Sequence, residues 1–210
     1  LATLDHLTDG RAGWNVVTSS DAFHGANFRR GGFLDHADRY TRAAEFVELS
    51  RELWDSWESD AIVANGSGAA GALAAGVFAD RSRIHDVDHH GPQFDVTGTF
   101  PVPRSPQRHP VIVQAGDSDE GRDLAAGHAE VVFSLHTEFD DAQAFHRDVT
   151  ERLERVGRSK DELLILPGAT FVLGDTADEA EERSRAIRRA QVSPATAIAV
   201  LEQVWNRDLS

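Results

Sequence analysis

The chain has 210 residues, of which 40% are hydrophobic and 27% are charged, and these are ordinary values for a globular protein. Its net charge of −14 argues against nucleic-acid binding, because an acidic surface repels phosphates. No apolar run reaches the roughly 18 residues of a membrane span and no signal-peptide pattern opens the chain, so we expect a cytoplasmic protein with no membrane partner. The absence of cysteine excludes disulfide bonds, thiolate metal ligands and a cysteine nucleophile.

The first residues have the pattern of a helix end, with Leu1, Leu4 and Leu7 at helical spacing and Gly10 as a C-terminal stop. The chain also contains no methionine, even at residue 1. We therefore expect it to be a piece of a longer protein.

A strand is predicted over Gly13–Ser19, and its end is polar, with Asn15, Thr18 and Ser19. In a parallel barrel, polar residues at the carboxyl end of a strand point into the mouth of the active site. The alternative is that these side chains simply begin the following loop. The sequence leaves both readings open.

A long loop is expected over Ser20–His36, and a strongly amphipathic helix follows over Asp38–Glu58. His36 and Tyr40 flank the start of that helix, and by themselves they are typical of surface packing. A loop or insertion region is expected at about 59–105, and it contains a Gly/Ala-rich stretch over Asn65–Gly76.

Three histidines in that region, His85, His89 and His90, alternate with acidic residues and resemble a metal-ligand cluster. Their spacing does not favour convergence on one ion, and a hairpin is predicted just after them, around Gln93–Gly98. We therefore expect a polar loop here and no metal site, with a histidine-based metallohydrolase as the less favoured reading.

The stretch Pro110–Glu130 predicts a strand, a turn and a helix in succession. The apolar run Val111–Ala115 is typical of a strand buried on both faces, Gly116 ends it, and a helix is expected over 117–129. The helix N-terminus presents free backbone N–H groups beside the hydroxyl of Ser118, a geometry that can hold a phosphate. Such joints occur in every α/β protein, so the pattern alone is weak evidence for a site.

Two more strands are predicted, over Val131–Leu135 and Leu163–Val172, and amphipathic helices are expected over Ala142–Val156, from Thr176 onward and over Ser193–Trp205. Strand and helix thus alternate four times, which predicts a parallel α/β sheet, either a barrel or a doubly wound layer. His136 comes just after a strand, at a position where barrel enzymes place active-site residues, although a rim histidine is the simpler reading.

Several motifs in family order along nearly the whole chain resemble the bacterial-luciferase-like flavin monooxygenases, in particular the group of nitrilotriacetate, dibenzothiophene-sulfone and long-chain alkane monooxygenases. The matching stretches are LATLDHLTDGRAGWNVVTS (1–19), Asn27–Phe28, HADRYTRAAEFVELSRELWDSWE (36–58), GVFAD (76–80), FPVPRSPQRHPVIVQAGDSDEGRDLAAGHAEVVF (100–133) and LPGATFVLGDTADEAEE (166–182). The resemblance implies a (β/α)₈ TIM barrel, of which this chain is a partial barrel holding about strands 4–7, as one domain over 1–210.

The resemblance also implies the activity. Members of the group use reduced FMN, supplied by a separate flavin reductase, together with O2, and the resulting hydroperoxyflavin oxidises a small organic substrate. They are usually homo-oligomers. Two alternatives stay open for this chain: a truncated, catalytically silent barrel remnant, and a deazaflavin-dependent oxidoreductase of the same superfamily.

The resemblance assigns cofactor-binding roles to six residues. His36 and Tyr40 match the family's H-x-x-R-Y motif at the flavin and its phosphate, Ser118 and the N–H of Asp119 match its phosphate contact, and Asn15 and Ser19, with Thr18, match its barrel mouth. One residue departs from the pattern, because Asp117 stands where relatives have Ala or Ser, and a carboxylate beside a phosphate in a dry site weakens flavin binding. No catalytic base is identified.

Overall fold

A computed structural model of the protein describes residues 1–19, 34–63, 70, 75–191, 193–205 and 208. The chain divides into two compact units, Leu1–Gly168 and Ala169–Ser210. Most of the predicted loop Ser20–His36, with Asn27 and Phe28, and most of the Gly/Ala-rich stretch Asn65–Gly76 lie outside the described residues. Among the described residues, no helix has the length and apolar content needed to cross a membrane.

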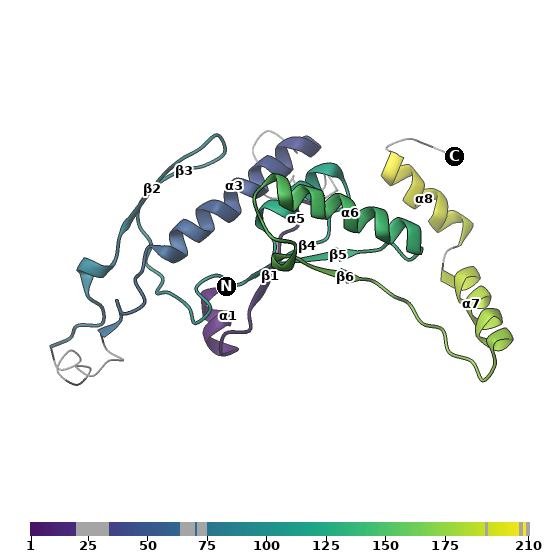
Figure 1. Cartoon of the computed structure of the whole chain (residues 1–210), viewed down its shortest axis with the longest axis horizontal. Helices are drawn as coiled ribbons and strands as arrows, with labels where there is room; N and C mark the ends of the chain where they lie inside the picture. The colour runs from purple at the N-terminus through teal and green to yellow at the C-terminus, as the bar shows by residue number, and fades with distance from the viewer. Residues whose placement is uncertain (20–33, 64–69, 71–74, 192, 206–207, 209–210) are drawn as a thin grey trace. The chain divides into compact units, whose positions relative to one another are not determined.

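The first unit is built on a sheet of four parallel strands, in the order β1-β4-β5-β6 (Figure 1). The strands are β1 (Gly13–Asn15), β4 (Val111–Gln114), β5 (Val131–Ser134) and β6 (Leu164–Pro167). Their positions and parallel direction confirm the predicted parallel α/β sheet. Because the strands are parallel, their carboxyl ends meet at one edge of the sheet.

Two of these strands are shorter than predicted. β1 ends at Asn15, although the N–H of Val16 still donates to the carbonyl of Val113 at 2.9 Å. β6 ends at Pro167, and the prediction that the strand continues through Ala169–Val172 is wrong. The neighbouring strand β5 ends at Ser134, which accepts a last hydrogen bond from Gly168 at 2.7 Å and leaves the following residues without a partner strand.

The helices α3 (His36–Asp55), α5 (Asp119–His128) and α6 (Phe139–Arg155) cover one face of the sheet, and a short helix α1 (Ala2–Leu7) precedes β1. α3 begins two residues earlier than predicted, because the carboxylate of Asp35 caps it by accepting the N–H of Asp38 at 2.9 Å. His36 therefore lies in the first helical turn and not in the preceding loop.

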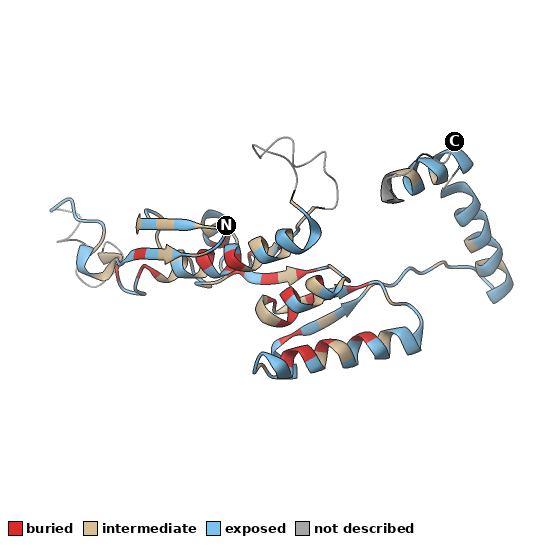
Figure 2. Ribbon diagram, turned by 90° about the horizontal axis from the view of Figure 1, so that it is seen from above, coloured by how far each residue is buried: buried red, intermediate tan, exposed pale blue. Residues whose placement is uncertain are grey.

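The hydrophobic core lies between these helices and the sheet, and its members are concentrated on the facing sides of α5 and α6 (Figure 2). The core residues come from every layer: Val16, Val47, Ile112, Leu124, Ala125, Ala126, Ala129, Val132, Phe145, Val149, Leu153 and Leu163. Side chains alternate between the two faces of the sheet along β4 and β5, and those on the helix-covered face are buried: Ile112, Gln114, Val132 and Ser134.

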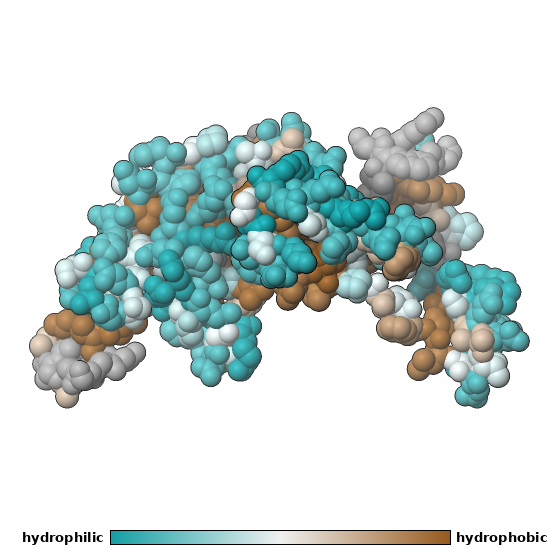
Figure 3. Space-filling view, in the orientation of Figure 1, coloured by the Kyte–Doolittle hydropathy of each residue, from teal (hydrophilic) through white to brown (hydrophobic). Residues whose placement is uncertain are grey.

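The opposite face of the sheet is exposed and apolar. Phe133, Leu164 and Leu166 lie on it with large exposed fractions, and Leu135 follows at the end of β5. Figure 3 shows apolar surface near the centre of the view, where the strands lie. In a closed parallel barrel this face would form the packed interior.

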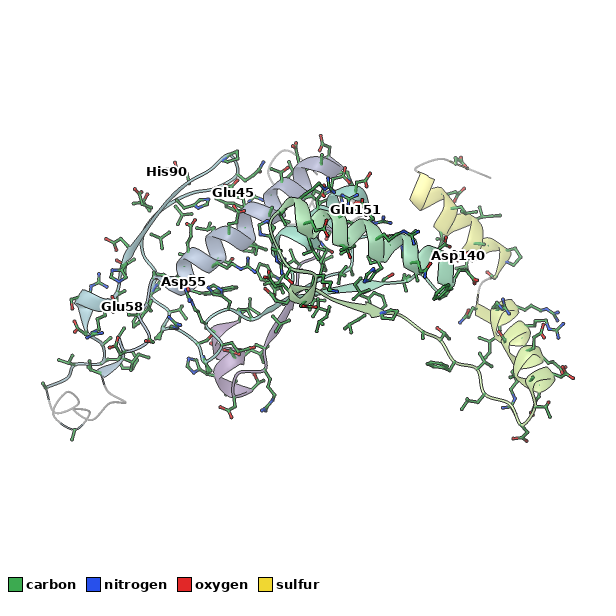
Figure 4. All side chains as sticks on the ribbon, viewed as in Figure 1. Glu45, Asp55, Glu58, His90, Asp140 and Glu151 are labelled. Carbon is green, nitrogen blue, oxygen red and sulfur yellow. The ribbon has the colours of Figure 1, made fainter. Side chains whose placement is uncertain are left out.

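An antiparallel hairpin follows a single short helical turn, η2 (Arg81–Arg83), and consists of β2 (Asp86–His90) and β3 (Asp95–Thr99). The predicted hairpin is confirmed, but the prediction of a polar loop at His85–His90 is wrong, because all but its first residue form β2. Glu45 of α3 holds the hairpin tip by accepting the N–H groups of Gln93 at 2.9 Å and Phe94 at 2.6 Å. Figure 4 shows Glu45 on α3 and His90 on the hairpin.

A single turn, η3 (Lys160–Glu162), leads from α6 into β6. The second unit contains α7 (Ala177–Gln191) and α8 (Pro194–Trp205), close to the predicted helices. Thr176 caps α7 by accepting the N–H of Glu179 at 3.2 Å.

Candidate functional site

A pocket of about 250 Å³ opens at the carboxyl edge of the sheet, where β1 and β4 end beside the first turns of α3. It is lined by Val17, Thr18, Ser19, His36, Arg39, Tyr40, Gln114, Ala115 and Gly116. Four residues singled out from the sequence, Thr18, Ser19, His36 and Tyr40, thus line one cavity although they come from separate segments.

The wall of this pocket depends on a glycine. A Cβ added at Gly116 would lie 2.5 Å from the hydroxyl oxygen of Tyr40, so only a glycine lets the tyrosine approach the end of β4. A Cβ at Gly121 would in turn lie 2.7 Å from the carbonyl carbon of Gly116. Two glycines therefore allow Tyr40, the end of β4 and the first turn of α5 to pack against one another.

Ser118 is the N-cap of α5, which begins at Asp119, two residues later than predicted. Its hydroxyl oxygen accepts the N–H of Gly121 at 3.2 Å, with an extended backbone at the cap. The N–H groups of Asp119 and Glu120 have no backbone acceptor within the helix, so they present partial positive charge at the edge of the sheet. This end of α5 can bind an anion.

His36 connects the first turns of α3 and α5. Its Nδ1 lies 3.3 Å from a carboxylate oxygen of Glu120, and its ring packs against Tyr40 with the ring centres 5.0 Å apart. The pKa of Glu120 is lowered by the hydrogen bond from its own backbone N–H and by bonds from Ser118 and His36. His36, Tyr40, Ser118 and Glu120 therefore form one connected group around the end of β4.

Gln114 is a candidate site residue that the sequence analysis did not single out. Its Oε1 accepts the N–H groups of Ala115 at 2.5 Å and Gly116 at 2.6 Å, which fixes the orientation of the amide. Its Nε2 is buried and has no hydrogen-bond partner among the described residues. A buried donor without a partner carries a free-energy penalty, which a bound ligand or water can relieve. The sequence did contain one indication of a site role for Gln114, namely its position at the end of a predicted strand, beside Gly116.

The side chain of Asp117 is 59% exposed in this part of the barrel. It binds the guanidinium group of Arg122 at 2.9 Å and lies 3.2 Å from Nε2 of His136. Arg122 also binds Asp148 of α6 at 3.0 Å. The exposure and these partners reduce the repulsion that the sequence predicts between Asp117 and a bound phosphate.

The other predicted residues lie around this group. Ser19 lines the pocket, and its carbonyl oxygen accepts a hydrogen bond from Arg39, whereas Asn15 lies outside the pocket lining, on β1 opposite Val113. The side chain of Asp119 faces Arg152 of α6, so only its backbone N–H belongs to the helix end that can meet an anion.

The histidines weighed as a metal cluster are separated by the strand geometry. His89 lies between Glu45 and Glu52 of α3, whereas His85 pairs with Glu58 and His90 with Asp88 and Asp95. Within the described part of the chain, no three potential ligands converge on one point. His89 serves the packing of the hairpin on α3.

A second, larger pocket of about 600 Å³ lies beside the first on the other side of Arg39. It is lined by Trp14, Val16, Val17, Thr18, Leu34, Arg39, Arg42, Ala43, Phe46 and Phe94. The two pockets share Val17, Thr18 and Arg39, so the end of β1 borders both.

Comparison with known proteins places this geometry in a family. Residues 1–208 match the family model described as luciferase-like monooxygenase. Nitrilotriacetate monooxygenase component A of Aminobacter aminovorans is 44% identical over 182 residues, which are 87% of this chain and 39% of that protein.

Two solved structures cover 99% of the chain with a TM-score of 0.86. The crystal structure of a long-chain alkane monooxygenase is 35% identical, and the chain covers 46% of it. The crystal structure of a riboflavin lyase with modified FMN and its substrate riboflavin is 31% identical, and the chain covers 45% of it. The chain thus spans less than half the length of these relatives. It belongs to the luciferase-like monooxygenase family, and its parallel sheet is part of that family's (β/α)₈ barrel.

Proposed function

We propose that the protein carrying this chain is a monooxygenase that uses reduced FMN and O2 to oxidise a small organic substrate, with a separate flavin reductase supplying the reduced flavin. Reduced FMN supplies the electrons that activate dioxygen, which no side chain of the protein can do. The cytoplasm as compartment stays a prediction from the sequence composition, and a homo-oligomeric state stays a prediction of the resemblance.

The residues at the sheet edge fit the phosphate of FMN. The observation that carries the proposal is the joint of β4 and α5, where Tyr40 packs on Gly116 beside the N-terminus that Ser118 caps. Gln114, whose Nε2 has no hydrogen-bond partner among the described residues, lines the pocket at this joint. Helix N–H groups and hydroxyl groups are the donors that bind phosphate in many proteins.

Each residue has a defined task in this proposal. Ser118 and the first N–H groups of α5, including that of Asp119, bind the phosphate, and the Tyr40 hydroxyl donates to it from α3. His36 orients Tyr40 through ring contact and pairs with Glu120. The Glu120 carboxylate also accepts from Ser118 and from its own backbone N–H, so it leaves these donors when a phosphate binds.

At the end of β1, Ser19 and Thr18 contact the ribityl chain, and Asn15 faces the ring from the mouth of the barrel. The exposed apolar face of the sheet excludes water once the barrel is complete.

The test is a titration of the full-length protein with reduced FMN under anaerobic conditions, repeated for Ser118→Ala and Tyr40→Phe. Each variant removes one hydrogen bond to a charged group, so we expect affinity to fall by about tenfold for each. Unchanged affinity in both variants contradicts the proposed site.

A matched control separates phosphate binding from helix capping. Thr176→Ala removes the same kind of cap from α7, where no flavin contact is proposed, and it is expected to leave FMN affinity unchanged. If Thr176→Ala weakens FMN binding as much as Ser118→Ala does, the effect of Ser118 is one of stability alone.

A further inference from the structure

A buried arginine of α6 binds the first turn of α5. The side chain of Arg152 is 9% exposed and lies among carboxylates of two helices. Its Nη1 donates to the carbonyl oxygen of Asp119 at 3.0 Å and to a carboxylate oxygen of Asp123 at 2.6 Å, and its Nη2 donates to the carboxylate of Asp119 at 2.6 Å. Nε completes the set with Asp148 at 2.9 Å.

These contacts hold backbone as well as side chains. A guanidinium group that binds both the carbonyl and the carboxylate of Asp119 restricts the first residue of α5 in position and in rotation. The N–H groups of that turn are the donors proposed to meet the flavin phosphate. Arg152 binds these groups from α6, so it is placed to act on the phosphate through the first turn of α5 and through its charge, not by direct contact.

Stability alone is a weak reason for this arrangement. Phe145, Val149 and Leu153 already pack α6 into the core without any contribution from position 152. Burying the Arg152 guanidinium group costs desolvation, and the attraction of carboxylates that are themselves solvent-exposed offsets that cost only in part. A need to hold the N-terminus of α5 in one orientation for ligand binding would explain why a buried arginine occupies position 152.

We propose that Arg152 is a positioning residue for the flavin phosphate: by bracing the first turn of α5 against α6, it fixes the direction in which the helix N–H groups and Ser118 meet the anion. This inference rests on the proposed function. It predicts an effect confined to ligands that carry the phosphate.

FMN and riboflavin provide the test, because they differ only in the phosphate. The full-length protein is titrated with reduced FMN, and riboflavin affinity is measured by its ability to displace FMN from the same site. For Arg152→Met we expect FMN affinity to fall about tenfold and riboflavin affinity to change less than about twofold. For Arg152→Lys, which keeps the charge but not the planar fork, we expect a smaller loss of the same kind.

Arg158 offers a matched control, because it follows α6 and binds the C-terminal end of α5 instead of its first turn. It is also largely buried, and it donates to the carbonyl oxygens of Ala126 and Ala129 at 2.8 Å, far from the proposed phosphate contacts. Arg158→Met is expected to lower stability and to leave the ratio of FMN to riboflavin affinity unchanged.

The outcomes separate this inference from the proposed function. If the wild-type protein does not prefer FMN to riboflavin, the proposed phosphate site fails and the inference fails with it. If the wild type prefers FMN but the ratio is unchanged in the Arg152 variants, or FMN and riboflavin lose affinity equally, the inference alone is overturned. Should Arg152→Met not fold, the milder Arg152→Lys variant decides by the same ratio.

Discussion

Asp5 is the most deeply buried acidic side chain among the described residues, and it ties two distant segments together. Its carboxylate accepts the N–H of Gln107 at 2.9 Å, the amide of the same residue at 2.5 Å and the N–H of Ala12 at 3.3 Å. Burial raises the pKa of Asp5, but the hydrogen bonds from Gln107, Ser105 and Ala12 outweigh it and lower the pKa to about 2. The charged form is therefore the stabilising one.

The lowered pKa predicts a pH-dependent contribution to stability. A carboxyl group whose folded pKa is depressed stabilises the protein above its unfolded pKa of about 4, and this contribution is lost as pH falls from about 4 to about 2. At pH 7 we expect Asp5→Asn to lower the free energy of unfolding by about 2 kcal/mol.

Urea denaturation at pH 7 and near pH 3 measures this effect, and the difference between wild type and Asp5→Asn should shrink at the lower pH. Asp9→Asn, at an exposed carboxylate four residues later, is the control and should change little at either pH. A wild-type advantage that grows on acidification would show that the charged form of Asp5 is not stabilising.

The residues of the site differ in how far the sequence predicts them. Ser118 is a helix-cap residue type directly before a helical pattern, so its place was predictable from neighbouring residues alone. The role of Gln114 could not be predicted from the sequence, because an unpaired amide can be recognised only when the positions of the surrounding atoms are known. Likewise, the approach of Asp117 to His136 depends on how α5 packs beside the end of β5, whereas its partner Arg122 lies only five residues away in the sequence.

At the scale of elements, α5 joins the core to the site, and its two glycines have opposite surroundings. Gly121 faces the end of β4, where an added Cβ would lie within 3 Å of three backbone atoms of Gly116. Gly127 is inside the same helix, and an added Cβ there would meet nothing within 4 Å.

This contrast predicts opposite effects of one substitution. Gly127→Ala should raise the free energy of unfolding by about 0.5–1 kcal/mol, because alanine loses less backbone entropy on entering a helix. Gly121→Ala should lower it by about 1–3 kcal/mol, because backbone atoms must move to accept the Cβ. Equilibrium unfolding in urea compares them, and equal effects of the two substitutions would contradict the packing of α5 on β4.

The hairpin is the element that the local pattern described least well. Its first strand, Asp86–His90, is so polar that it predicts a loop, and strand formation there depends on pairing with β3 and on Glu45. Glu45 lies far from this strand in the sequence, and β3 pairs with it across a turn. The strand is therefore a consequence of tertiary contacts, and composition gave no signal of it.

At the scale of the whole molecule, the sheet has one covered and one exposed face. Phe133 lies on the exposed face of β5 with 39% of its surface accessible, in register with Leu166 of β6. Relatives have more than twice the length of this chain, and in a complete barrel such side chains fill the interior. Phe133 should therefore be a core residue of the full-length protein.

Phe133→Asp tests this in the full-length protein. Burying a carboxylate in a barrel interior should cost at least about 3 kcal/mol of stability or prevent folding. Phe139→Asp is the control, because Phe139 begins α6 on the outer layer and is 74% exposed, so we expect a change within about 0.5 kcal/mol. Thermal unfolding and soluble yield give the comparison, and a harmless Phe133→Asp would mean that the barrel does not close over this face.

The sequence by itself determined the alternation of strands and helices, the parallel sheet and the family, because hydrophobic period, helix caps and short motifs are properties of neighbouring residues. Only the tertiary structure decided which distant groups meet: Tyr40 on Gly116, Arg152 on Asp119, and Asp117 between Arg122 and His136. The physical reason is that charge pairing and close backbone approach depend on how the helices pack on the sheet, and many packings satisfy the same local pattern.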